Sequence, residues 1–199
     1  MMSSDFGVNG ILTQEADARE LRMSLQAQMG SAAPAWFMRI GLPLSAPEQA
    51  GIAAMLRDLA FAPGTPIAGV ASWADAAQFL RAEEWDNRWW DAEEEERERL
   101  WSVAAERMTE GELLARLTAV TAALGDPVRN GASLAASRSG VADPGLVRAA
   151  VDAALLAAHQ QALAGLAVAP AGHYFQRKFE LFAAGRWPLG VFSGKYVVF

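Results

Sequence analysis

The chain has 199 residues, of which 52% are hydrophobic and 42 are alanine, and it contains no cysteine. This length and composition predict a single helix-rich domain over residues 1–199, with residues 1–12 as a candidate flexible end, and exclude disulfides, thiolate metal sites and cysteine nucleophiles. A net charge of −6 argues against attraction of the whole chain to nucleic acid or to an anionic membrane surface.

No targeting or membrane-spanning segment is predicted. The first ten residues, MMSSDFGVNG, contain neither a basic region nor an apolar core, so we expect no secretory signal peptide. The most apolar window, residues 149–170, is interrupted by Asp152, His159 and two glutamines, which favours a buried helix over a bilayer span. We therefore expect a cytoplasmic protein, and the use of 15 Arg against 2 Lys suggests a bacterial one.

Helix start and stop signals divide the first half of the chain. Thr13 is a candidate N-cap for a helix over residues 13–29. Ser45 and Glu48 have the spacing of a capping box, which predicts a helix that ends before Pro63. Ser72 precedes a further helix that starts at Trp73.

The second half contains four more predicted helices. Thr109 and Glu112 form a second capping box, with a predicted stop at Gly125. Asp-Pro pairs at 126–127 and 143–144 each place an N-cap acceptor before a first-turn proline. We expect a short helix from the first pair that ends near Ser137, a long one over residues 144–168, and a last helix over residues 172–184. The total is seven.

The composition changes at the end of the chain, and the pattern of residues 186–199 predicts a small β-hairpin. β-branched and aromatic residues flank Ser193-Gly194, a plausible two-residue turn. Because an isolated hairpin is marginally stable in water, we expect it to pack on the helices. The fold class is therefore mainly α: a bundle-like domain of about seven helices with a C-terminal hairpin.

Residues 83–99, EEWDNRWWDAEEEERER, carry nine acidic side chains against three arginines. One interpretation is a solvated helix face supported by Glu–Arg pairs three and four residues apart. The other is an acidic surface that docks a basic partner, with Trp85, Trp89 and Trp90 as candidate binding residues, because tryptophan is enriched at interface hot spots.

Helical spacing places Glu96 on the same face as Trp89 and Leu100, and Glu84 on an apolar face of the preceding segment. With Asp152 and His159, these carboxylates are the weak candidates for a metal-dependent or acid–base active site. The Glu-x-x-His pairs of a di-iron bundle are missing. A lone histidine on an apolar ridge is also common in protein cores. We predict no metal and no cofactor.

The last 29 residues carry the opposite charge, with two arginines and both lysines of the chain against Glu180. Candidate binding residues here are His173, Arg177, Arg186 and Trp187, which together suit an anion or an acidic peptide. The alternative is that these cations pair with the acidic helix of the same chain or of a neighbouring subunit.

The leading hypothesis is a non-catalytic protein-interaction or small-ligand-binding domain that uses the acidic segment 83–99 and the basic aromatic segment 173–196. Its partner would be another protein or a second copy of the chain, with no role for nucleic acid or membrane. One alternative is an enzyme that uses interior carboxylates and His159. The other is a structural homo-oligomer in which the oppositely charged segments meet.

Overall fold

The structure is a computed structural model that describes residues 34–81 and 86–199, together with Ala16, Arg19, Glu20 and Met23. Within these residues it has six helices and a three-stranded sheet, so the mainly α prediction is confirmed. The predicted helix over 13–29 lies outside the described residues except at those four, which are helical, and the candidate flexible end 1–12, Glu84 and Trp85 lie outside them altogether.

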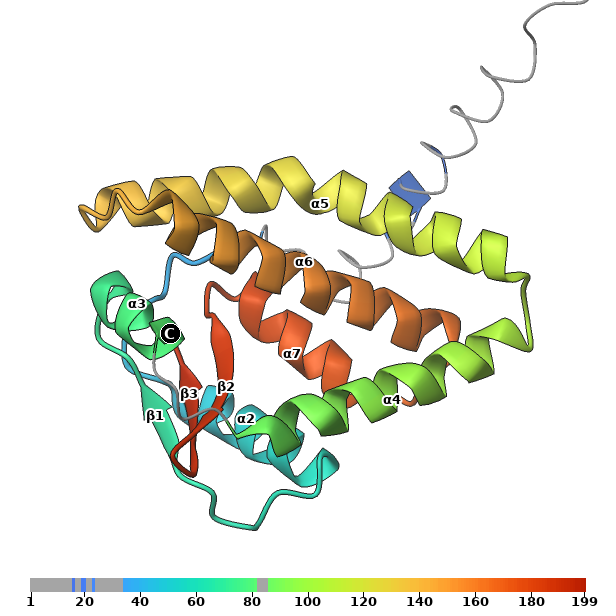
Figure 1. The fold of residues 1–199 in the computed structure, drawn as a ribbon, viewed down its shortest axis with the longest axis horizontal. Helices are drawn as coiled ribbons and strands as arrows, with labels where there is room; N and C mark the ends of the chain where they lie inside the picture. The colour runs from blue at the N-terminus through green and yellow to red at the C-terminus, as the bar shows by residue number, and fades with distance from the viewer. Residues whose placement is uncertain (1–15, 17–18, 21–22, 24–33, 82–85) are drawn as a thin grey trace, which may run out of the picture.

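Two long helices, α5 (Glu110–Arg138) and α6 (Pro144–Leu166), run side by side along one side of the molecule (Figure 1). Helix α6 also contacts α7 (Tyr174–Ala183) and α4 (Asn87–Ala105) on its other side. Its alanines at 150, 154, 157 and 158 are all buried, which lets neighbouring helices approach closely. Helix α6 therefore supports the two helices whose charged faces form the candidate site.

Helices α2 (Ala46–Asp58) and α3 (Trp73–Arg81) and the three strands lie together, in the lower left part of Figure 1. Helix α2 packs on α7, and α3 contacts the sheet through Phe79, whose ring meets Phe192 and Phe199. Strands β2 (Pro188–Phe192) and β3 (Lys195–Val198) form the predicted antiparallel hairpin. Its turn, Ser193-Gly194, has positive φ at both residues, as a two-residue hairpin turn requires.

A third strand, β1 (Ile67–Gly69), was not predicted. It pairs in parallel with β3, with Ile67 opposite Tyr196 and Gly69 opposite Val198. The strand order is β1-β3-β2, so the C-terminal strand lies in the centre of the sheet. A three-residue strand has no periodic pattern of its own, and its extended conformation depends on the partner strand.

Several predicted helix starts are confirmed, whereas the predicted end at Gly125 and the predicted start at Asp126 are wrong. Both capping boxes are present, at Ser45 with Glu48 and at Thr109 with Glu112, and Asp143 caps α6. However, α5 does not stop at Gly125 and restart at Asp126; it continues through Pro127 to Arg138. Its buried face, Leu113, Leu117, Val120, Leu124, Val128 and Ala132, passes the proline without a break. Packing of this face against α6 outweighs the loss of one backbone hydrogen bond.

Candidate functional site between α4 and α7

The acidic helix α4 and the start of the basic segment meet beneath α6. Lys178 Nζ lies 2.6 Å from a carboxylate oxygen of Glu93, and His173 Nε2 lies 2.7 Å from one of Glu96. For Lys178, the interpretation in which the C-terminal charges pair with the acidic helix of the same chain is therefore correct, and His173 forms a hydrogen bond with that helix. The two pairs lie at different depths and have different surroundings.

The deeper pair belongs to a buried polar network. Glu93 and Lys178 are 1% and 4% exposed, and Lys178 also donates to Gln160 at 3.1 Å. Glu93 accepts further hydrogen bonds from Tyr174 and from Gln160, and the Trp89 indole N–H donates to the Tyr174 hydroxyl at 3.1 Å. Lys178 Nζ lies 5.1 Å from the centre of the Trp89 ring, a cation–π distance. Because both charges have several partners, the pair is tolerated in the core.

Two tyrosines border this network and stay protonated at neutral pH. Burial, together with the negative charge of Glu93, raises the pKa of Tyr174 and of Tyr196 well above the usual value. Tyr174 is consequently a hydrogen-bond donor to Glu93 and is not available as a phenolate base.

The sequence analysis missed Glu93. The spacing argument placed Glu96 on the inward face, whereas the buried residues of α4 are Trp89, Glu93, Leu100 and Ala104, and Glu96 is only partly buried. Two features of the sequence could have indicated the pair of Glu93 and Lys178. Glu93 lies four residues after Trp89. Lys178 is one of only two lysines in the chain and precedes a phenylalanine that is buried.

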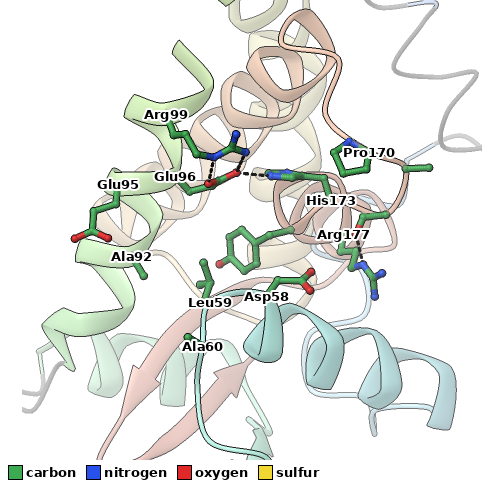
Figure 2. Close-up of a pocket in the computed structure, with 13 residues that line it drawn as sticks. Asp58, Leu59, Ala60, Ala92, Glu95, Glu96, Arg99, Pro170, His173 and Arg177 are labelled. Carbon is green, nitrogen blue, oxygen red and sulfur yellow. Dashed lines mark hydrogen bonds and ion pairs between the residues drawn. The ribbon is translucent and has the colours of Figure 1, made fainter. Parts of the chain in front are cut away.

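A surface pocket of about 670 Å³ borders the network at Tyr174, and we call it the α4–α7 pocket. Three segments line it: α4 from Ala92 to Arg99, residues 170–177 at the start of α7, and residues 58–60 at the end of α2 (Figure 2). The two charged segments singled out from the sequence therefore form opposite parts of one concave surface.

The turn that ends α2 supplies the third wall of the pocket. Ala60 has a left-handed φ of 58°, and the hydrogen bonds Ala60 N to Arg57 O and Phe61 N to Leu56 O close a Schellman motif. This turn stops the helix directly after Asp58 and directs the chain away from α7. Asp58 is therefore held at the pocket as the last helical residue.

Glu96, Arg99 and His173 form a connected group in the pocket wall (Figure 2). Arg99 donates to both oxygens of Glu96, at 2.7 and 2.6 Å. Burial by itself raises the pKa of Glu96, but the hydrogen bonds and charges of Arg99 and His173 outweigh it and lower that pKa below its usual value. Glu96 is thus an ionised carboxylate whose oxygens both already have partners.

The hydrogen bonds of His173 define its tautomer. Its Nδ1 accepts the backbone N–H of Phe175 at 3.2 Å, which makes His173 the N-cap of α7. The ring proton of the neutral form is therefore on Nε2, from which it is donated to Glu96. With both nitrogens engaged, His173 has no free lone pair with which to take a proton from a bound molecule.

Arg177 is the cation of the pocket that has no carboxylate partner in the described parts of the chain. Its side chain is half-buried, and its Nε donates to the carbonyl oxygen of Gly172. This bond engages Nε, and the two terminal NH₂ groups have no hydrogen-bond partner among the described residues. Arg177 lines the pocket. Among the cationic candidates from the sequence, it is the one best placed to meet a ligand.

Among the candidates proposed for catalysis, the described residues Glu96, Asp152 and His159 are not brought together as a metal site, and Glu84 lies outside the described residues. Asp152 is exposed and pairs with Arg148 at 3.6 Å, and Glu96 has the partners described above. His159 is half-buried on α6, where burial and the charge of a nearby arginine lower its pKa, so it is neutral at pH 7. Across residues 34–81 and 86–199, no three His, Asp or Glu side chains are grouped so that they could hold a metal ion.

The other candidate binding residues that the structure describes do not line the α4–α7 pocket. Trp89 is buried in the network, and Arg186 and Trp187 are each 1% exposed in the interior. Trp90 is 48% exposed on α4. Of the residues named from the sequence, the pocket therefore combines Glu96, His173 and Arg177.

Comparisons of the chain with protein-family models, with curated proteins and with solved structures find no match. In the described part of the chain, no helix has the length and apolar character needed to cross a bilayer. The function must therefore be argued from the geometry of the site.

Proposed function

We propose that this protein binds a small molecule that carries a carboxylate, in the α4–α7 pocket. The observation that carries the proposal is Arg177, a half-buried guanidinium that lines the pocket, is held by a backbone carbonyl, and forms no ion pair with any carboxylate that the structure describes.

Arg177 has the properties of an anion anchor. A guanidinium remains charged at any physiological pH and presents its N–H donors in a rigid plane that matches the two oxygens of a carboxylate. The hydrogen bond from Nε to Gly172 limits the orientations of the side chain before any ligand binds. Less rotational freedom is then lost on binding, which favours affinity.

The rest of the pocket suits a small organic molecule. Its volume of about 670 Å³ lies within the range of small-molecule sites. Leu59, Ala92 and Pro170 supply apolar surface, while Arg99 donates two hydrogen bonds to Glu96 in another part of the wall. A pocket that combines apolar surface with oriented polar groups can both bury and orient a small ligand.

The proposal is tested by isothermal titration calorimetry of the full chain with benzoate and L-phenylalanine, and with benzamide as the uncharged analogue of benzoate. We expect at least one carboxylate to bind and benzamide not to bind. Arg177→Gln should weaken carboxylate binding by about 10- to 100-fold, since a hydrogen bond to a charged group contributes roughly 1.5–3 kcal/mol.

The matched control is Arg116→Gln, which removes an exposed arginine of α5 that does not line the pocket. This variant should bind as the unmodified protein does. Equal binding of benzoate and benzamide, unchanged carboxylate affinity in Arg177→Gln, or the absence of binding by both carboxylates would each contradict the proposal.

A further inference from the structure

We infer that the ligand of the α4–α7 pocket is a zwitterion of the amino-acid type, with its carboxylate on Arg177 and its ammonium group on Asp58. The inference rests on the proposed function and adds the second charge, which that function does not require. It also adds a preference for a bulky apolar side chain.

Asp58 and Arg177 are opposite charges in the lining of one pocket. In Figure 2 the Asp58 carboxylate points to the side on which the Arg177 guanidinium lies. The structure places no ion pair or hydrogen bond between these two described residues. Each charge is thus left for a bound molecule. In an α-amino acid the ammonium and carboxylate groups are bonded to one carbon atom, so one molecule presents both charges to the same pocket.

The position of Asp58 in the fold also favours a cation. It is the last residue of α2, where the carbonyl ends of the helix carry a partial negative charge. A carboxylate at this end of a helix is electrostatically unfavourable, and a positive group beside it relieves the repulsion. An ammonium group held there would interact with the Asp58 carboxylate and with the helix end together.

The other charges of the pocket do not alter this balance. Glu96 is compensated by Arg99 and by its hydrogen bond to His173. Glu95 is exposed, and in Figure 2 its carboxylate points away from His173. A plain anion would meet repulsion from Asp58, and a plain cation would meet repulsion from Arg177, whereas a zwitterion meets neither.

The apolar part of the pocket indicates the rest of the ligand. Leu59, Ala60, Ala92 and Pro170 supply the apolar part of the pocket lining. A volume of about 670 Å³ is much larger than the backbone of one amino acid requires. We therefore expect a large apolar side chain to be favoured over glycine, because burial of its apolar surface favours binding.

The test is calorimetric titration of the full chain with L-phenylalanine, glycine, N-acetyl-L-phenylalanine and L-phenylalaninamide. The acetyl derivative lacks the ammonium charge, and the amide lacks the carboxylate. We expect L-phenylalanine to bind best, with each of the other three at least about 10-fold weaker, the loss associated with one charge-assisted hydrogen bond.

Two variants test which residue binds each charged group of the ligand. Asp58→Asn should weaken L-phenylalanine about 10-fold and bind the N-acetyl derivative at least as tightly as the unmodified protein does, because a repulsive charge is removed, while Arg177→Gln should weaken both. Asp91→Asn, at an exposed position of α4 that does not line the pocket, is the control and should bind as the unmodified protein does.

The outcomes separate this inference from the proposed function. If N-acetyl-L-phenylalanine or benzoate binds as tightly as L-phenylalanine, or if Asp58→Asn has no effect, the zwitterion is wrong while carboxylate binding at Arg177 stands. If glycine binds as tightly as L-phenylalanine, the preference for an apolar side chain is wrong. Tighter binding of the amide than of every carboxylate, or no binding by any carboxylate, would overturn both.

Discussion

At the scale of single residues, the buried pair of Glu93 and Lys178 is the part of the molecule most sensitive to substitution. Lys178→Met removes the cation and leaves the Glu93 carboxylate in the core with only neutral hydrogen-bond partners. We expect the free energy of unfolding to fall by about 3–5 kcal/mol, the usual cost of breaking a buried ion pair. Urea denaturation measures this change.

The double variant Glu93→Leu with Lys178→Met distinguishes pairing from packing. Because it removes both charges, it should be more stable than Lys178→Met alone, although Tyr174 and Gln160 then lose partners. Glu94→Gln, at a partly exposed pair with Arg97, is the control and should cost no more than about 1 kcal/mol. A double variant less stable than the single one would show that the two charges do not depend on each other.

At the scale of secondary-structure elements, α5 shows that residues favouring a helix end do not always end the helix. Gly125, Asp126 and Pro127 favour a helix end, yet the apolar face of the helix continues across them and keeps the segment helical. Residues that favour a helix end change the free energy of folding by a few kcal/mol at most. Burial of a continuous apolar helix face contributes more than this.

Two glycines of α5 give a matched test of this packing. A Cβ on Gly131 would lie 2.5 Å from the Cβ of Trp36, whereas one on Gly125 would meet nothing within 4 Å. We expect Gly131→Ala to lower the free energy of unfolding by about 1–3 kcal/mol through overpacking. Gly125→Ala should raise it by about 0.5–1 kcal/mol through helix propensity. Thermal and urea unfolding measure both; shifts of the same sign would contradict the close approach of Trp36 to α5.

At the scale of the whole molecule, Arg186 connects the beginning of the described chain with its end. It donates hydrogen bonds to the carbonyl oxygens of Arg39, Leu42 and Pro43 and to the carboxylate of Glu48. Sequence analysis proposed Arg186 as a binding residue, but the structure places it in the interior, where it joins the segment before α2 to the segment before β2.

This connection predicts a pH dependence of stability. Burial by itself raises the pKa of Glu48, but hydrogen bonds from Arg186 and Ser45 outweigh it and lower that pKa from 4.5 to about 2. Because the folded state binds this proton less tightly than the unfolded state, the contribution of Glu48 is fully present above about pH 4.5. It is lost as the pH falls toward 2.

Glu48→Gln should therefore be less stable than the unmodified protein at pH 7, and the difference should shrink steadily between pH 4.5 and pH 2.5. Urea denaturation at a series of pH values measures this difference. Glu98→Gln, at an exposed position in the middle of α4, is the control and should track the unmodified protein throughout. A difference that stays constant with pH would show that Glu48 does not titrate in this range.

The sequence by itself determined the features that depend on neighbouring residues. The caps at Ser45, Thr109 and Asp143 and the Ser193-Gly194 turn satisfy their backbone within a few residues, so they are recognisable without any tertiary contact. The sequence also showed that acidic and basic side chains are concentrated in separate segments, and these two segments supply the charged walls of the pocket.

Only the tertiary structure decided what depends on contacts between distant segments. Glu93 rather than Glu96 became the buried acid because α4 turns that face toward Lys178, which lies 85 residues further along the chain. Strand β1 is extended because β3 offers it a partner, and Asp58 and Arg177 line the same pocket because α2 packs on α7. These contacts form only when the whole chain has packed, since the free energy of burial is shared among many side chains and no local pattern records it.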